Sequence, residues 1–174
     1  MTRLRLLLPL ILAVAGAALA QAPKKAEPAA PAFDFKARMQ QVMDAWSTMD
    51  PNKAAPFYST DKGNVFYDIA PLKYTGWAAY AEGVQKVLAD FSSIKIAVGK
   101  DAATHTRGNL TWGTATWHMD ALMKDGKSAP FDGRWTVIWQ KSGDDWLIVH
   151  EHVSVPLPGE PPKKEPAKKA TPKK

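Results

Sequence analysis

Two histidines near the end of the chain have a spacing that suits chemistry. His150 and His152 are separated by one residue within an apolar run, so on a β-strand both imidazoles would project from the same face. Such a pair can supply half of a metal site, which His118 or Asp120 on a neighbouring strand would complete. Spacing alone leaves coordination undetermined. Hydrogen bonding to adjacent strands, or a place at a pocket rim, is therefore favoured, and no metal is expected.

An arginine and several aromatic residues form a second group of candidates. Arg134 enters an apolar strand beside Trp135, and a buried guanidinium is costly unless it is paired or faces a cavity. It would receive a ligand carboxylate in a bidentate manner, or pair with Asp68 or Asp120. Aromatic side chains usually fill cores, although their rings also suit a pocket for a flat apolar ligand. The aromatic candidates are Trp77, Tyr80, Trp112 and Trp117.

Other kinds of catalytic site are excluded by the sequence. The chain has no cysteine, which excludes disulfides and thiolate chemistry. It has neither a Gly-rich phosphate-binding loop nor a Gly-x-Ser-x-Gly motif. No cofactor is therefore expected.

The elements that position these residues are predicted from hydrophobic periodicity. Apolar residues recur at helical spacing over 35–49, and Pro51 opens a short second helix. The clearest helical stripe covers 77–91. Strand patterns cover 64–69, 94–98, 110–123, 131–141 and 146–156. Helices followed by a meander of strands predict an α+β fold.

One face of this sheet is expected to lack a cover within the chain, because three helices can cover only one face. The long strands are nevertheless apolar on both faces, as where Trp135 and Val137 alternate with Ile138. An uncovered apolar face has to be buried against something. We therefore expect a homodimer formed through this face.

The two ends of the chain differ in composition from the segment between them. Residues 1–20 place two arginines before an apolar run that ends in Ala-Leu-Ala, which is typical of a signal peptide. Residues 21–32 predict a disordered linker, and residues 159–174, with six lysines, predict a disordered tail. The folded domain is thus expected at 33–158. The mature protein is expected in the periplasm or outside the cell, without stable membrane insertion.

The net charge of +6 belongs to the ends of the chain. Between Phe33 and Pro158 there are 13 basic and 14 acidic residues. A nucleic-acid footprint requires clustered Lys and Arg on a folded face, so no nucleic-acid partner is expected. The basic tail is interpreted as a solvated linker, with weak attachment to an anionic surface as the alternative.

The closing hairpin carries a motif that is known from other proteins. Its last strand reads Trp146-Leu-Ile-Val-His-Glu-His-Val-Ser154. This ending resembles SnoaL-like proteins of the nuclear-transport-factor-2-like superfamily and the association domain of calcium/calmodulin-dependent kinase II. The resemblance spans 35–156 and implies a cone-shaped, curved antiparallel sheet covered on one face by about three N-terminal helices. That scaffold hosts isomerases, cyclases, dehydratases, ligand binders and oligomerisation hubs.

Within this superfamily, residues 57–76 resemble ketosteroid isomerase, and the resemblance gives Asp68 the position of the catalytic base. A carboxylate at the mouth of an apolar cone is desolvated, which raises its basicity. The oxyanion donors depart from that pattern. Val42 or Met43 stands where a Tyr donor is expected, and Thr136 stands near the later acid.

Three functions follow from these features, and whether the protein is an enzyme stays open. The favoured function is an exported domain that binds a small, largely apolar or carbonyl-bearing ligand in its cone. The first alternative is a lyase or isomerase with Asp68 as general base and His118 as a weaker catalytic candidate. The second is a structural oligomerisation module without a ligand. The predicted ligand-binding residues are Tyr58, Tyr67, Trp77, Tyr80, Trp117, Arg134, His150 and His152.

Overall fold

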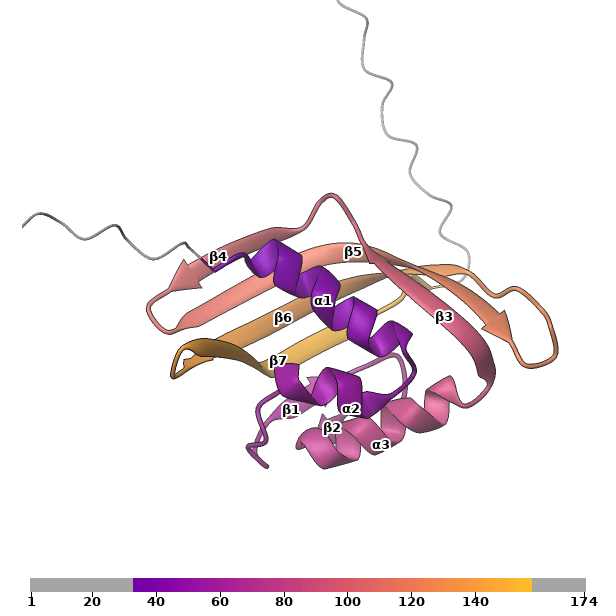
Figure 1. Cartoon of the computed structure of the whole chain (residues 1–174), viewed down its shortest axis with the longest axis horizontal. Helices are drawn as coiled ribbons and strands as arrows, with labels where there is room; N and C mark the ends of the chain where they lie inside the picture. Colours follow the sequence, from indigo (N-terminus) through magenta and orange to yellow (C-terminus); the bar gives the residue numbers. More distant parts are fainter. Residues whose placement is uncertain (1–32, 158–174) are drawn as a thin grey trace, which may run out of the picture. The chain divides into compact units, whose positions relative to one another are not determined.

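The computed structural model describes residues 33–157, which form three α-helices, a 3-10 turn and seven strands (Figure 1). The predicted signal peptide, linker and tail lie outside the described residues. No helix within 33–157 combines the length and the hydropathy that a membrane span requires. The elements are α1 (Phe35–Ser47), α2 (Pro51–Ala54), η1 (Ala55–Phe57), β1 (Val65–Tyr67), β2 (Tyr74–Thr75), α3 (Trp77–Leu88), β3 (Phe91–Val98), β4 (Ala103–Arg107), β5 (Leu110–Met123), β6 (Phe131–Ser142) and β7 (Asp145–Ser154).

The helices begin and end where local chemistry requires it. The Asp34 carboxylate accepts a hydrogen bond from the backbone N–H of Ala37 at 2.9 Å and caps α1. Asp50 caps α2 in the same way, with Pro51 at the first helical position. Gly76 precedes α3 with φ of 76°, a conformation that a residue with a Cβ rarely adopts.

All seven strands belong to one sheet, in the order β2-β1-β7-β6-β5-β3, with β4 paired to β5 off this path. The first part of β5 pairs with β4 and the last part with β3. Neighbouring strands are antiparallel except β1 and β7, which are parallel. This parallel pair places the first strand of the sheet against the last, so that Phe66 lies opposite Glu151.

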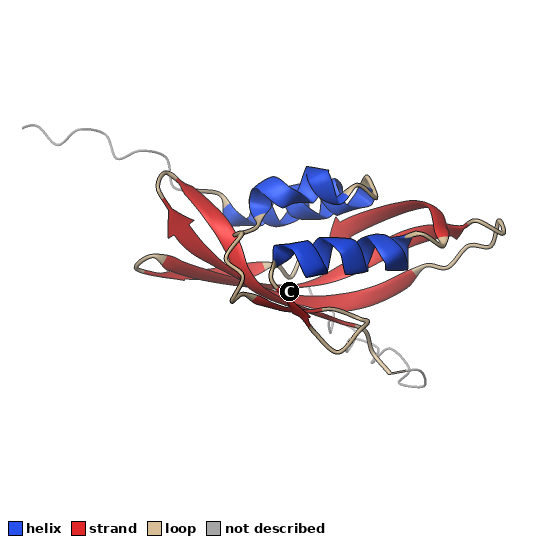
Figure 2. Ribbon diagram, turned by 90° about the horizontal axis from the view of Figure 1, so that it is seen from below, coloured by secondary structure: helices blue, strands red, loops and turns tan. Residues whose placement is uncertain are grey.

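The helices lie on one side of the curved sheet (Figure 2). Burial alternates strictly along β5, where Ala115, Trp117 and Met119 point inward and the residues between them are exposed. Met39 and Val42 of α1 are fully buried. The predicted α+β fold, with about three helices covering one face of a curved sheet, is thereby confirmed.

A β-bulge interrupts the alternation along β7. The register shifts between Ile138 and Trp139 of β6, whose partners are His150 and Ile148, so Val149 is an extra residue in β7. Before the bulge the even-numbered residues of β7 are buried. After it, the odd-numbered residues point inward, because one added residue exchanges the two faces.

Candidate functional site

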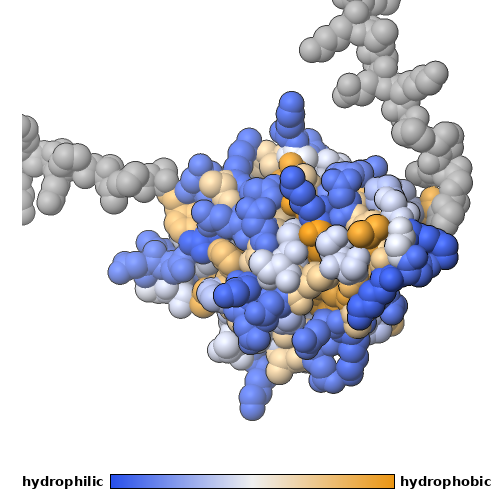
Figure 3. Space-filling model, turned by 45° about the vertical axis from the view of Figure 1, so that its right-hand side comes forward, coloured by the Kyte–Doolittle hydropathy of each residue, from blue (hydrophilic) through white to orange (hydrophobic). Residues whose placement is uncertain are grey.

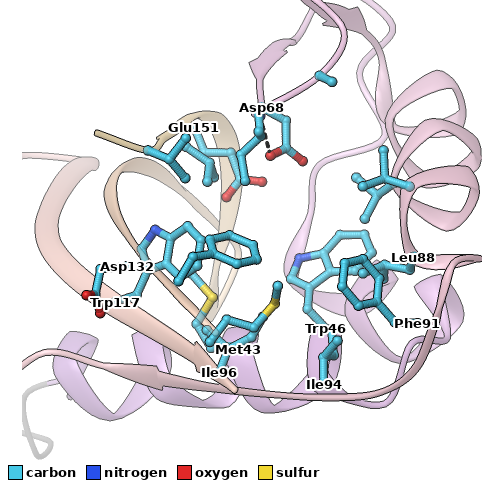
Figure 4. Close-up of a pocket in the computed structure, with 18 of the residues that line it drawn as sticks. Met43, Trp46, Asp68, Leu88, Phe91, Ile94, Ile96, Trp117, Asp132 and Glu151 are labelled. Carbon is cyan, nitrogen blue, oxygen red and sulfur yellow. Dashed lines mark hydrogen bonds between the residues drawn. The ribbon is translucent and has the colours of Figure 1, made fainter. Parts of the chain in front are cut away.

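The inner face of the sheet and helices α1 and α3 form a cavity of about 600 Å³ (Figure 4). Most of its wall is apolar, and Figure 3 shows apolar surface bordered by hydrophilic side chains on the side of the domain that it brings forward. The apolar wall includes Met43, Trp46, Val84, Leu88, Phe91, Ile94, Ile96, Trp117, Met119, Phe131 and Val153.

Two carboxyl groups lie together at one end of this cavity (Figure 4). Asp68 immediately follows β1, and Glu151 lies on β7. The parallel pairing of these strands brings them together across 83 positions of sequence. Asp68 also accepts a hydrogen bond from the N–H of Ile69 at 2.7 Å, so it holds its own loop while its carboxyl group faces the cavity.

Glu151 is the most buried charged residue of the described chain, at 1% exposure. Its Oε1 accepts a hydrogen bond from the hydroxyl of Tyr58 at 2.9 Å, and its Oε2 accepts one from Nε1 of Trp135 at 2.8 Å. The Tyr58 hydroxyl in turn accepts a hydrogen bond from Nε1 of Trp46 at 2.8 Å. Two buried donors therefore converge on one carboxyl group, and the Trp46 indole is linked to it through Tyr58, so all three donors have an acceptor.

Burial raises the pKa of Glu151 to about 7, and the nearby negative charge of Asp68 adds to the effect. The hydroxyl of Tyr80, the Trp135 indole and the hydroxyl of Tyr58 favour the ionised form and oppose this rise in pKa. Near neutral pH, Glu151 therefore exchanges between its acid and carboxylate forms.

The other titratable groups of the cavity are also perturbed by burial. Burial raises the pKa of Asp68 above its usual value, while the Ile69 N–H and the Tyr80 hydroxyl act in the opposite direction. Burial and the charge of Glu151 hold the pKa values of Tyr58 and Tyr80 well above the ordinary value for tyrosine. Both hydroxyls consequently remain protonated donors at neutral pH.

Five of the predicted site residues lie in or directly behind the cavity. Asp68, Tyr80 and Trp117 line it. Tyr58 is 3% exposed and reaches Glu151 from behind the wall. Trp77 stacks on Tyr58, with ring centroids 4.5 Å apart, and so supports the wall without forming it.

The hydroxyl donors do not come from the positions that the ketosteroid isomerase resemblance suggested. Met43 lines the cavity as an apolar residue, and Thr136 is exposed. The hydroxyls instead belong to Tyr58 and Tyr80, and the second acid is Glu151.

His150 and His152 do not line the cavity, because the bulge at Val149 turns them to the outer face of the sheet. There they flank Tyr67, whose ring centroid lies 5.6 Å from His150 and 5.7 Å from His152. Nδ1 of His150 is hydrogen-bonded to the carbonyl of Val65 at 2.7 Å. This contact is the bond to a neighbouring strand that the sequence favoured.

His118 and Arg134 also lie away from the carboxyl pair. Nδ1 of His118 contacts Asp132 at 2.7 Å and Nε2 contacts Asp120 at 3.3 Å. His118 and Arg134 both border a second hollow of about 460 Å³, which is separate from the cavity that holds the carboxyl pair. In the described residues, Arg134 forms no ion pair with Asp68 or Asp120. Residues 33–157 also contain no group of three or more His, Cys, Asp or Glu side chains placed to hold a metal.

Glu151 is the functional residue that sequence reasoning missed. The signal was an acidic residue inside an otherwise apolar final strand, between the two histidines that drew attention instead. Simple alternation from the buried Trp146 and Ile148 predicts an inward His150 and an outward Glu151. Only the bulge reverses this assignment.

The cavity therefore combines an apolar body with one polar end. A carboxyl group with a pKa near neutrality, such as Glu151, can give or accept a proton, and the adjacent Asp68 carboxyl group can act as a base in its ionised form. The same groups can also hold the polar head of a ligand by hydrogen bonds or by charge.

Comparisons with known proteins agree with this architecture. A nuclear-transport-factor-2-like superfamily protein from Salmonella enterica is 22% identical, with a TM-score of 0.63 over 72% of this chain and 93% of that one. A nuclear-transport-factor-2-like protein of unknown function from Pseudomonas putida is 20% identical, with a TM-score of 0.61 over 72% and 87%. The association domain of calcium/calmodulin-dependent kinase II from C. elegans is 16% identical, with a TM-score of 0.56 over 70% and 93%.

No curated protein sequence matches this chain significantly. The model of the SnoaL-like domain, in contrast, matches residues 36–158, which include every strand and helix of the described domain except the first residue of α1. The chain therefore belongs to the SnoaL-like family, and its fold is that of nuclear-transport-factor-2-like proteins.

Proposed function

We propose that this domain binds a small, largely apolar molecule in its cavity, with the polar group of the ligand against Asp68 and Glu151. The observation that carries the proposal is the pairing of an apolar cavity of about 600 Å³ with two convergent carboxyl groups. Pockets for small molecules typically measure about 300–1,000 Å³ and have few polar groups on apolar walls.

The size of the cavity supports binding over a purely structural role. Protein interiors are close-packed, and a void lined by apolar side chains lowers stability in proportion to its volume. Here large side chains such as Trp46, Phe91 and Trp117 border open space instead of filling it. A bound molecule would recover the missing contacts.

The binding test uses N-phenyl-1-naphthylamine, a neutral apolar dye whose fluorescence rises on burial. We expect saturable binding at one dye per domain. Val84→Trp should weaken it because the larger side chain occupies the cavity that Val84 lines. Leu110→Phe, which adds apolar volume at an exposed position of β5, serves as the control and should leave binding unchanged. Absence of saturable binding by the unaltered protein would contradict the proposal.

A second candidate function, lyase or isomerase chemistry, is favoured by one specific observation. Asp68 and Glu151 are adjacent acids of which Glu151 has a pKa of about 7, an arrangement suited to proton transfer. Asp68 would act as the base, and the Tyr80 hydroxyl would stabilise the developing oxyanion. His118 is not the partner in this scheme, because its side chain is held by Asp132 and Asp120 outside the carboxyl pair.

Proton abstraction can be tested without knowing the substrate. In D₂O, the domain should speed deuterium exchange at the carbons next to the carbonyl of 4-phenyl-2-butanone, measured by NMR. Asp68→Asn should abolish the increase while leaving dye binding intact. Equal exchange with and without protein would remove this candidate and leave ligand binding standing.

The composition of residues 1–20 bears on where the protein is located. Residues 1–20 have the composition of a cleaved signal peptide, and we infer export to the periplasm or beyond. The intact mass of the protein recovered from its native host should correspond to a chain that begins at Gln21. A mass that includes residues 1–20 would contradict cleavage.

A further inference from the structure

The charged residues of the cavity are all of one sign. Among the described residues that line it, Asp68, Asp132 and Glu151 are acidic and none is Lys, Arg or His. Asp132 has a basic partner in His118, whose Nδ1 lies 2.7 Å from Oδ1 of Asp132. Asp68 and Glu151 have no basic partner within hydrogen-bonding or ion-pair distance in residues 33–157.

We propose, on the basis of the ligand-binding function above, that the cavity selects ligands whose polar head is an ammonium group on an apolar body. A cation is the one ligand group that compensates both carboxyl groups at once. A carboxylate head would instead place a third negative charge beside them, in surroundings that solvate charge poorly.

The hydrogen bonds at Glu151 leave room for such a ligand. Oε1 accepts a hydrogen bond from Tyr58 and Oε2 accepts one from Trp135, and the Tyr80 hydroxyl also interacts with this carboxyl group. A carboxylate oxygen can accept more than one hydrogen bond. Glu151 can therefore keep its structural bonds and still receive an N–H donor from the cavity.

Aromatic rings beside the carboxyl pair strengthen the case for a cation. Trp46 and Tyr80 line the cavity with ring centroids 5.7 Å apart, and the Tyr80 hydroxyl interacts with both Asp68 and Glu151. The face of an indole or phenol ring attracts a cation, most strongly where water is excluded. An alcohol or ketone gains little from such rings.

Ligand charge should make binding depend on pH. The titratable groups that face Glu151 are Asp68 from the end of β1, Tyr58 after η1 and Tyr80 from α3. The two tyrosines stay protonated, and Glu151, with a pKa of about 7, changes state near neutrality. An ammonium ion binds the ionised form of Glu151 in competition with a proton. Its affinity should therefore rise as pH increases through about 7.

The test compares three molecules with the same apolar body: 4-phenylbutylamine, 4-phenylbutan-1-ol and 4-phenylbutyrate. Displacement of N-phenyl-1-naphthylamine at pH 6 and pH 8 gives their affinities. At pH 8 we expect the amine to bind about tenfold more tightly than the alcohol, since hydrogen bonds to charged groups are the stronger ones. The carboxylate should bind more weakly than the alcohol. Only the amine should gain affinity from pH 6 to pH 8.

Two variants assign the preference to the carboxyl pair. Glu151→Gln should abolish the advantage of the amine and its pH dependence while the alcohol still binds. Asp68→Asn should reduce the advantage, and it decides the question if Glu151→Gln does not fold, as judged by circular dichroism. Glu82→Gln makes the same chemical change at an exposed position of α3, where Glu82 pairs with Lys86, and should change nothing.

Failure of this inference differs from failure of the proposed function. Binding of the alcohol or carboxylate at least as tightly as the amine would overturn selection for a cation and leave the pocket a ligand site. Amine preference that persists in both carboxyl variants would also overturn it. If neither the dye nor any of the three molecules binds, both proposals fall.

Discussion

A single buried acid, Glu151, links the stability of the fold to the chemistry of the cavity. It is the acceptor for Tyr58 and Trp135, and through Tyr58 it also fixes the indole of Trp46. These hydrogen bonds define where one end of the cavity lies. The same burial that makes Glu151 structural also brings its pKa to about 7.

The raised pKa of Glu151 predicts how stability changes with pH. Between about pH 4.5 and 7, the folded protein holds a proton on Glu151 that the unfolded chain has released. The free energy of unfolding should therefore fall as pH rises through this window, by up to about 3 kcal/mol from this residue. Asp68, whose pKa is also raised, acts in the same direction.

Urea unfolding of the unaltered protein and of Glu151→Gln between pH 5 and pH 8 isolates this contribution. At pH 5 the free energy of unfolding of the variant should be lower than that of the unaltered protein. By pH 8 the unaltered protein should have lost stability, so that the difference disappears or changes sign. A stability difference that does not change with pH would show that Glu151 remains ionised throughout.

The Tyr58 hydroxyl is the next residue whose role can be measured. Tyr58→Phe leaves Nε1 of Trp46 without its acceptor and removes one donor from Glu151. We expect the free energy of unfolding to fall by about 1–3 kcal/mol, the cost of leaving buried polar groups unpaired. Urea unfolding measures it.

Tyr67→Phe provides a matched control on the outer face, where the Tyr67 side chain is 39% exposed. Its effect should stay within about 0.5 kcal/mol, as for most surface substitutions. Equal losses in the two variants would mean that the buried hydrogen bonds contribute nothing beyond packing.

At the scale of the elements, the position of Trp117 depends on the absence of a side chain on β6. A Cβ placed on Gly133 would lie 2.1 Å from Cζ2 of Trp117, so β5 and β6 can pack this indole against the cavity only with glycine there. Gly133→Ala should lower the free energy of unfolding by about 1–3 kcal/mol through overpacking. Thermal or urea unfolding detects the change.

A double-mutant cycle with Trp117→Leu gives the control for this clash. In the Trp117→Leu background, the smaller side chain leaves room for the added methyl group, so Gly133→Ala should cost clearly less. Additive effects of the two substitutions would contradict the close packing of Gly133 and Trp117.

The elements also show how far the sequence alone leads. Hydrophobic periodicity identified α1, α3 and the meander of long strands, because a helix or strand that buries one face must repeat apolar residues at its own period. It also placed Asp68 correctly at the end of β1. These features depend on residues that are close together in the sequence, so their pattern can be recognised without knowing the fold.

The missing part of the site depends on pairing between distant strands. No local sequence pattern indicates that β1 lies parallel to β7 or that Val149 is an extra residue in β7. Without the bulge, simple alternation from Trp146 and Ile148 would turn His150 and His152 inward. The sequence therefore predicted the scaffold and one of the two carboxyl groups, and left open which face of the sheet carries the histidines.

At the scale of the whole molecule, the outer face of the sheet remains uncovered in the described chain. Trp112 is 37% exposed there and stacks on His105, with ring centroids 5.4 Å apart, and Ile138 lies beside it through the β5–β6 pairing. Exposed large apolar residues such as Trp112 and Leu110 on this otherwise polar face can mark an interface. We infer that two copies associate through it.

This assembly predicts a dimer at micromolar concentration, measured by sedimentation velocity. Trp112→Lys should shift the protein to monomer, because a buried unpaired charge opposes association. Leu72→Lys adds the same charge at a loop residue that is 91% exposed and should leave the dimer intact. A monodisperse monomer for the unaltered protein would contradict the inference.

The parallel pairing of β1 with β7 has a consequence for the order in which the protein becomes functional. Within residues 33–157, β1 pairs only with β2 and β7, and contacts of such high sequence separation as those with β7 carry a large loop-closure cost. A chain that has emerged as far as β6 holds Asp68 but has neither Glu151 nor the strand that fixes the end of the cavity. A chain interrupted before the final strand thus retains most of the apolar wall of the cavity but lacks the carboxyl pair that forms its polar end.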